Sequence, residues 1–340
     1  MAIGPAQRRV PQILDEVRVL VGPAHRAIID GLSPALARVA RYHIGWTDTD
    51  GNPIQHAGKA IRPALAVLSA RAVGGDAVAA VPVAVAVELI HDFTLLHDDI
   101  MDDDRTRRGR PAAWTVFGTA TAVLTGDALL ALTWDLAASE SISPAAMAVL
   151  GRTLLELCRG QSADLTFERC TDISLAEALD MAEHKTGALL GAACELGALA
   201  GGAESVAALA YRQFGRQLGI VFQLVDDLLG IWGDPLHTGK HVGADLVAQK
   251  NSLPIVAAMA SGTTAGDRLA ELYRDTESMN PRVLQQATEL VELAGGREWV
   301  QTEIDRRMRL ALDSLDAAEP VPAISAELHA LAQYLTRRDG

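Results

Sequence analysis

LLHDDIMD (residues 95–102) and FQLVDDLLGIWGD (residues 222–234) decide the fold, because each places paired aspartates inside an apolar stretch. In the first, Asp98 and Asp102 are four residues apart, which on a helix puts their carboxylates on one face, one turn apart. Like charges at this spacing destabilise a helix unless a cation neutralises them. Mg²⁺ usually binds through one or two carboxylates plus substrate phosphates. The pattern therefore predicts a helical enzyme that uses magnesium and a diphosphate.

The rest of the sequence also favours an all-α fold. The chain has 340 residues, of which 49% are hydrophobic. Nothing resembles the alternation of a strand ladder, and the Gly-Gly pairs at 74–75, 201–202 and 295–296 stand where helices should end. Apolar residues recur at helical spacing in 12–40, 64–97, 120–139, 145–165, 175–201, 204–231, 252–259, 281–294 and 299–318. No linker is apparent, so we expect a single domain over 1–340, with residues 1–8 disordered.

Charge and composition exclude several classes of protein. The net charge of −13 disfavours nucleic-acid binding, although Arg105, Arg107, Arg108 and Arg110 form a local basic cluster. The N-terminus shows no signal peptide, and no apolar run reaches the roughly 18 residues of a membrane span. We therefore expect a cytoplasmic protein with no stable membrane span.

The cysteines fit the same expectation. There are three of them, Cys158, Cys170 and Cys194, and they lack the spacing of metal ligands. We expect them to be small buried hydrophobic residues in a reducing cytoplasm.

Several short motifs occur in a fixed order along the chain. They are GKAIRP (58–63), ELIH (88–91), DDIMD (98–102), RRG (107–109), GQSAD (160–164), HKTG (184–187) and QLVDDLLG (223–230). Together they resemble the trans-isoprenyl diphosphate synthase (polyprenyl synthetase) family, from Gly58 almost to the C-terminus. The resemblance implies one large helical bundle of the isoprenoid synthase type, with a central active-site cavity. It also implies a homodimer.

The resemblance assigns one group of cations to isopentenyl diphosphate, the nucleophilic substrate. Lys59 and Arg62 would bind its diphosphate, together with His91 and Arg108. For His91 the alternative is a core histidine whose hydrogen bonds are satisfied within the protein. Arginine suits a diphosphate because its planar fork donates two parallel hydrogen bonds.

A second group would serve the allylic diphosphate, which is the dimethylallyl, geranyl or farnesyl compound. By resemblance, Asp98 and Asp102 bridge two Mg²⁺ ions to it, with Asp99 in support. Arg107, Lys185 and Lys240 would supply further positive charge. Ionisation of the allylic carbon–oxygen bond needs this neutralisation of the leaving group.

Three further residues complete the implied site. Thr186 would face the developing carbocation, Gln223 would lie beside it, and Asp226 would bind a third Mg²⁺ with support from Asp227. The chain departs from the family pattern at Gly230, where a third aspartate is common. We expect the missing carboxylate to weaken or alter this metal site. A second departure is Trp114, in a region where the family often has a histidine.

Product length should depend on the residues beneath the first motif. Phe93 and Thr94 precede Asp98 by five and four positions, so Phe93 lies about 7.5 Å deeper along a helix. One aromatic beside a small residue, with no insertion in the motif, resembles synthases of geranylgeranyl diphosphate (C20). Farnesyl diphosphate (C15) and longer products are the alternatives.

Two other classes of protein share parts of the pattern. A class I terpene cyclase has a similar fold and metal site, but its pocket needs aromatic faces and only 4% of residues here are aromatic. A non-catalytic partner subunit of a synthase typically lacks one Asp-rich motif. This chain keeps Asp98, Asp99, Asp102, Asp226 and Asp227, which favours an active enzyme.

Overall fold

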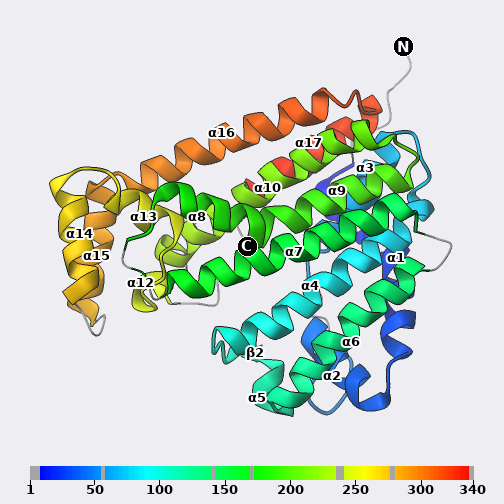
Figure 1. Ribbon diagram of the computed structural model, residues 1–340, viewed down its shortest axis with the longest axis horizontal. Coiled ribbons are helices and arrows are strands. Elements are labelled where there is room, and N and C mark those ends of the chain that lie inside the picture. Colours follow the sequence, from blue (N-terminus) through cyan, green and yellow to red (C-terminus); the bar gives the residue numbers. More distant parts are fainter. Residues whose placement is uncertain are drawn as a thin grey trace. The chain divides into compact units, whose positions relative to one another are not determined.

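The computed structural model describes residues 8–54, 58–138, 142–168, 170, 172–234, 241–275 and 280–336. Helices account for almost all of its regular structure, which confirms the all-α prediction (Figure 1). In chain order the elements are α1 (Val10–Asp30), α2 (Pro34–Ile44), α3 (Ile61–Ala72), η1 (Ala77–Ala80), α4 (Val81–Met101), β1 (Thr106–Arg107), β2 (Arg110–Pro111), α5 (Ala113–Phe117), α6 (Thr119–Ala138), α7 (Pro144–Phe167), α8 (Leu175–Ala182), η2 (Glu183–Gly187), α9 (Ala188–Ala200), α10 (Ser205–Trp232), α12 (Ala244–Val247), α13 (Leu253–Met259), α14 (Thr264–Asp275), α15 (Pro281–Leu293), α16 (Gly296–Asp316) and α17 (Pro322–Thr336).

The chain divides into two compact units. Unit 1 comprises Met1–Leu154, Leu189–Gly215 and Ser314–Leu331. Unit 2 comprises Leu155–Ala188, Arg216–Asp313 and Ala332–Gly340. The single-domain interpretation of the whole chain stays a prediction.

Helix α4 forms the apolar centre of unit 1. Its residues from Val83 to Val87 are all buried, and α6, α3 and α1 pack against it. Helices α3 and α9 approach so closely that a Cβ added at Gly197 would lie 2.0 Å from the carbonyl oxygen of Ala66. Glycine is therefore required at this contact, since any side chain would push the two backbones apart. The result is a rigid position for α3, which begins one residue before Arg62.

Helix α10 connects two apolar clusters in unit 2. Ile220, Val221 and Leu224 pack with residues of α8, α13 and α16. Two turns after Leu224, Ile231 packs with residues of α12 to α15. The aspartates of the second motif lie on α10 between these two clusters, so packing fixes the helix on both sides of them.

Two segments are long and apolar enough to cross a membrane: Ala77–Met101 and Thr119–Ala138. The first contains α4, whose most apolar window is half buried inside the protein. A core helix of a soluble protein passes the same test, so length and composition here are weak evidence for a span.

The structure also describes Arg8, which we expected within a disordered end. Its Nε donates to Oε1 of Glu327 at 2.7 Å, and both residues belong to unit 1. Residues 1–7 lie outside the described part of the chain.

Candidate active site

A two-residue β-hairpin follows the first Asp-rich motif in unit 1. Strands β1 and β2 pair Arg107 with Arg110, and the turn consists of Arg108 (φ 53°) and Gly109 (φ 71°). Positive φ at both turn positions is the geometry of a type I′ turn, whose twist matches that of the strands. The sequence did not predict this hairpin, because two-residue strands are too short to show alternation.

The two arginines Arg107 and Arg108 of the hairpin donate hydrogen bonds to different partners outside it. Arg107 Nε donates to Oδ1 of Asp99 at 2.7 Å, and Arg108 Nη1 donates to the carbonyl of Ile44 at 3.0 Å. Trp114 contacts the segment before the hairpin, since its Nε1 donates to the Asp104 carbonyl at 2.8 Å. This bond joins α5 to the loop that follows the first Asp-rich motif.

The first Asp-rich motif forms the C-terminal end of α4. Asp98 and Asp102 are half-buried, and the Asp102 amide donates to the Asp98 carbonyl at 2.8 Å. Negative charge is unfavourable at this end of a helix, because the macrodipole is already negative there.

Asp99 differs from its neighbours. Only 1% of its side chain is exposed and it accepts from Arg107, so it positions the arginine.

A separate group in unit 1 is basic. Burial, and then the guanidinium groups of Arg62 and Arg108, lower the pKa of His91 well below its usual value. Burial also lowers the pKa of Arg62, although the carboxylates of Glu88 and Asp92 oppose this effect. His91 is therefore a neutral imidazole among cations, which can donate an N–H to an anion.

The segment that carries Lys59 lies beside this group. A Cβ added at Gly58 would lie 3.6 Å from Nη2 of Arg108. Lys59 itself is exposed. Unit 1 thus brings together Arg62, His91 and Arg108, with Lys59 next to them in the chain.

Phe93 and Thr94 lie on α4 below the aspartates. The Phe93 ring meets the His97 ring edge-on, with centroids 4.8 Å apart. His97 in turn packs on α6, where a Cβ at Gly126 would lie 2.3 Å from its Nε2. The Thr94 hydroxyl donates to the His91 carbonyl at 2.9 Å, so it is satisfied within its own helix. Phe93 is therefore backed by a residue that α6 holds in place.

In unit 2, Lys185 and Thr186 lie in η2, a single π-helical turn between α8 and α9. Such turns are rare and often mark functional sites. A Cβ at Gly219 of α10 would lie 3.0 Å from the Thr186 carbonyl oxygen and 2.4 Å from the Gly187 Cα. Lys185 Nζ donates to Asp164 of α7. The widened turn is thus wedged between α7 and α10.

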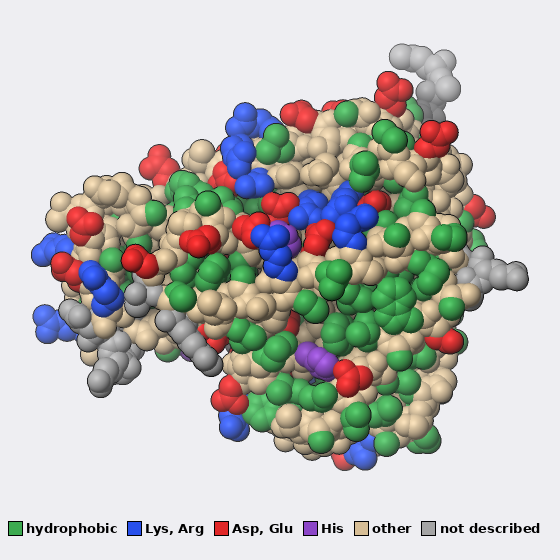
Figure 2. Space-filling view, viewed as in Figure 1, with side chains coloured by type: hydrophobic (Ala, Val, Ile, Leu, Met, Phe, Trp, Pro, Cys, Tyr) green, Lys and Arg blue, Asp and Glu red, His purple; other side chains and the backbone are tan. Residues whose placement is uncertain are grey.

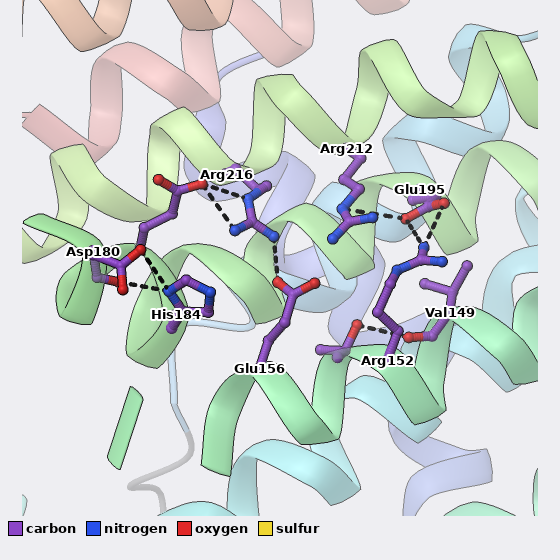
Figure 3. A network of polar contacts seen from close by, with 10 residues as sticks. Val149, Arg152, Glu156, Asp180, His184, Glu195, Arg212 and Arg216 are labelled. Carbon is purple, nitrogen blue, oxygen red and sulfur yellow. Dashed lines mark hydrogen bonds and ion pairs between the residues drawn. The ribbon is translucent and has the colours of Figure 1, made fainter. Parts of the chain in front are cut away.

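Arg216 fixes the start of this turn. Its Nε donates to Oε1 of Glu183 at 2.9 Å, and its Nη1 donates to Glu156 of α7 (Figure 3). His184 is held by Asp180, whose carbonyl lies 2.7 Å from Nδ1. A separate network in unit 1, also drawn in Figure 3, joins Arg152 and Arg212 to Glu195.

A chain of hydrogen bonds runs from the π turn to the second Asp-rich motif. The Thr186 hydroxyl donates to Oε1 of Gln223 at 2.8 Å, and Gln223 Nε2 donates to Oδ1 of Asp227 at 2.7 Å. The amide of Leu253 donates to Oδ2 of Asp227 at 2.8 Å, at the start of α13. Burial raises the pKa of Asp227 to about 7, against the lowering effect of the bonds from Leu253 and Gln223.

The two aspartates of this motif are therefore not equivalent. Asp227 Oδ1 accepts from Gln223, one turn earlier on α10, and its Oδ2 accepts from Leu253 at the start of α13. Asp226 is half-buried on a different face of α10. Lys240, the remaining predicted cation, lies outside the described residues.

Within the described residues, no group of three or more His, Cys, Asp or Glu side chains forms a metal cage. Mg²⁺ does not need one, because it binds through one or two carboxylates plus phosphates and waters. Asp98 and Asp102, paired at the negative end of a helix, are hard oxygen donors whose charge a cation would relieve. The residues present therefore fit a magnesium–diphosphate site.

Comparisons with known proteins identify the family of the chain. Residues 51–291 match the model of the polyprenyl synthetase family, so the chain belongs to this family. In Mycobacterium tuberculosis H37Rv, a (2E,6E)-farnesyl diphosphate synthase is 42% identical over 97% of this chain and 94% of its own length. A geranylgeranyl diphosphate synthase from the same organism is also 42% identical, over 96% of this chain and 93% of its own. A polyprenyl synthetase structure from Streptomyces coelicolor A3(2) superposes with a TM-score of 0.91, at 42% identity over 96% of this chain and 99% of the other.

Proposed function

We propose that this chain is a magnesium-dependent trans-prenyltransferase that condenses isopentenyl diphosphate with an allylic diphosphate. The observation that carries the proposal is the charge pattern of unit 1. A carboxylate pair at the end of α4 fits a metal-bound diphosphate, whereas Arg62, His91 and Arg108 fit a second diphosphate without metal. A cyclase would use only one diphosphate, and the family assignment favours the synthase.

The chain's residues divide the work as follows. Asp98 and Asp102 would hold two Mg²⁺ ions and Asp226 a third, and bound Mg²⁺ would offset the charge of the departing diphosphate. Arg107, held in place by Asp99, would bind the allylic diphosphate with Lys185 and Lys240. Lys59, Arg62, His91 and Arg108 would orient isopentenyl diphosphate for attack.

The π turn would contribute in a different way. Its geometry places the Thr186 hydroxyl on Gln223, and the tight contact with Gly219 fixes the Thr186 carbonyl. Fixed oxygen dipoles stabilise developing positive charge without reorganising during the reaction. We assign Thr186 and Gln223 to the side of the site where the allylic cation forms.

For the product we propose geranylgeranyl diphosphate. Relatives named for the C15 and the C20 products are equally identical to this chain, so identity does not separate the two. Phe93 supports C20, because one aromatic braced by His97 would limit the chain while the small Thr94 leaves room. A Phe93→Ala variant should make products longer than those of the wild type, as measured by mass spectrometry. Unchanged product length would contradict this assignment.

A homodimer is part of the proposal. Helix α6 leaves one stripe exposed, which contains Leu124 (59% exposed), Asp127, Ala131 and Trp134 (37% exposed), and Figure 2 shows apolar side chains gathered over this helix. A largely apolar stripe of this kind, with one carboxylate in it, would be covered by a second copy. Light scattering should give twice the chain mass, and Trp134→Glu should shift it toward the monomer.

We also propose a cytoplasmic location. The expectation that all three cysteines are buried was wrong for Cys158 and Cys170, which are exposed, whereas Cys194 is buried. All three are free thiols, as is usual in a reducing compartment.

The activity itself is tested with the purified chain, Mg²⁺ and isopentenyl diphosphate, supplied with each of the C5, C10 and C15 allylic primers. We expect condensation with each primer and no release of diphosphate when isopentenyl diphosphate is omitted. Release without it would favour a cyclase. A chain that is inactive alone would favour the non-catalytic partner subunit.

A further inference from the structure

Three charged residues, Glu156, Glu183 and Arg216, connect the π turn η2 to its two neighbouring helices. The Nε of Arg216 on α10 donates to Oε1 of Glu183 at 2.9 Å, and its Nη1 donates to Glu156 of α7 (Figure 3). Arg216 is buried, and all three residues belong to unit 2. We call these three residues the Arg216 clamp. Through one guanidinium the clamp joins three helical segments with charge-assisted hydrogen bonds.

Glu183 is also the residue at which the turn becomes wide. Its carbonyl accepts a hydrogen bond from the amide of Ala188, five residues later, whereas an α-helix bonds residues that are four apart. Turns of this kind are rare and occur mostly singly, so surrounding contacts must hold them in the π form. The side chain of the same glutamate accepts from Arg216. The clamp therefore holds the residue whose backbone closes the wide turn.

The backbone of the turn lies between the same two helices that carry the other clamp residues. A Cβ added at Gly160 of α7, or at Gly219 of α10, would lie 2.4 Å from the backbone of the turn. Gly160 follows Glu156 by four residues, so the two share one face of α7. Gly219 follows Arg216 by three residues, so these two share one face of α10. Each helix therefore contacts the turn through its backbone and, one helical turn earlier, carries a charged residue of the clamp.

We propose that Arg216 is a positioning residue for the allylic half of the reaction, because its clamp keeps η2 in the π form. The π form determines where Lys185 and Thr186 lie. Without the clamp, the turn can close over four residues instead of five, which moves both side chains relative to α7 and α10. Arg216 thus acts through the turn rather than on a substrate. This inference rests on the proposed function, which assigns Lys185 to the allylic diphosphate and Thr186 to the allylic cation.

The test compares steady-state kinetics of the full-length wild type with two clamp variants and one control, all well below their unfolding temperatures. Arg216→Gln removes the guanidinium, and Glu183→Gln keeps the shape of a half-buried side chain while it removes the charge. The control is Arg307→Gln. The side chains of Arg307 and Arg216 are 12% and 9% exposed, and Arg307 Nη1 donates to Gln217 of α10 at 3.0 Å. The control therefore removes a similarly buried guanidinium that joins α16, rather than η2, to α10.

We expect Arg216→Gln to lower kcat by about a hundredfold, because a misplacement of about 1 Å in the site is enough for a loss of this size. Its KM for the allylic substrate should rise. Its KM for isopentenyl diphosphate should stay unchanged, because the residues assigned to that substrate belong to unit 1. Glu183→Gln should lower kcat less, since its amide oxygen can still accept from Arg216. Arg307→Gln should leave kcat and both KM values unchanged, even if urea denaturation shows an equal loss of stability.

Two results would overturn the inference while the proposed function stands, because the wild type still condenses its substrates in both. One is a kcat of Arg216→Gln equal to that of Arg307→Gln. The other is a KM for isopentenyl diphosphate that rises as much as the KM for the allylic substrate, which would indicate general loosening. If Arg216→Gln does not fold, the same two comparisons are made with Glu183→Gln. A wild type that forms no product with any primer would overturn the proposed function, and the inference with it.

Discussion

The two Asp-rich motifs look alike in sequence but are built differently. In unit 1, Asp98 and Asp102 lie at the C-terminal end of α4, and Asp99 accepts a hydrogen bond from Arg107. In unit 2, the aspartates lie inside α10, where Asp227 accepts the amide of Leu253. The first motif therefore places negative charge at a helix end, whereas the second lies inside a helix and uses Asp227 to join α10 to α13.

In both motifs the second aspartate of the Asp-Asp pair, Asp99 or Asp227, has a positioning role that its neighbours determine. Asp99 faces a guanidinium, so its contribution is to aim an arginine. Asp227 faces a helix N-terminus and an amide, so its contribution is to fix α10 against α13. The remaining aspartates, Asp98 and Asp102 in the first motif and Asp226 in the second, are the ones that we assign to metal ions.

The largest expected effect is a difference in the rate of condensation between variants of the two motifs. Asp98→Asn should reduce the rate of condensation by about a thousandfold or more, since it removes a carboxylate that would hold metal against the leaving group. Asp226→Asn should cost less, because we assign it one ion rather than two. Steady-state kinetics at saturating Mg²⁺ measures both. Equal losses of rate in Asp98→Asn and Asp226→Asn would contradict this difference between the motifs. The matched control is Asp103→Asn, because Asp103 is exposed beside the first motif.

Next is an effect on stability. Asp227→Ala should lower the free energy of unfolding by about 1–3 kcal/mol, because the Leu253 amide and Gln223 Nε2 lose their partner. The half-buried Asp226→Ala should change it by clearly less. Urea denaturation of the metal-free proteins compares the two, and a larger loss for Asp226→Ala would contradict the structural role of Asp227.

A smaller effect has the opposite sign. Asp102→Asn should stabilise the metal-free protein by about 0.3–1 kcal/mol, since it removes a negative charge from the C-terminus of α4. The gain should shrink as salt is added. Thermal unfolding in EDTA at low and high ionic strength measures this, and destabilisation under both conditions would refute the helix-end argument.

A further effect is a pH slope in unit 1. Burial, and then the charge of Glu88, raise the pKa of Asp92 to about 8. A carboxyl whose folded pKa is raised contributes stability below its unfolded pKa, near 4, and loses it as the pH rises to its folded pKa. Wild-type stability should therefore fall between about pH 4 and 8 and level off above pH 8, and the slope should be shallower in Asp92→Asn. Parallel slopes would show that Asp92 does not titrate there.

The sequence was sufficient for the fold class and the long helices, because buried faces leave a clear 3.6-residue pattern. We did not predict α14, whose sequence is largely polar, or α17. The break between α1 and α2 also escaped us, although Pro34 marks the start of the second helix. Short strands and a single π turn carry too few residues to form a pattern.

For the site, the motif residues could be predicted from the family resemblance, but their partners could not. The bond between Asp99 and Arg107 lies beside a type I′ turn, and the bond from Leu253 to Asp227 joins positions 26 residues apart. Such contacts arise from backbone geometry that no short motif records.

The account is tested most directly by the products that the purified chain makes from farnesyl diphosphate and isopentenyl diphosphate. With Mg²⁺ present, we predict geranylgeranyl diphosphate as the main product, its loss in EDTA, and its return when Mg²⁺ is restored. No condensation under any of these conditions, or condensation that persists in EDTA, would contradict the account.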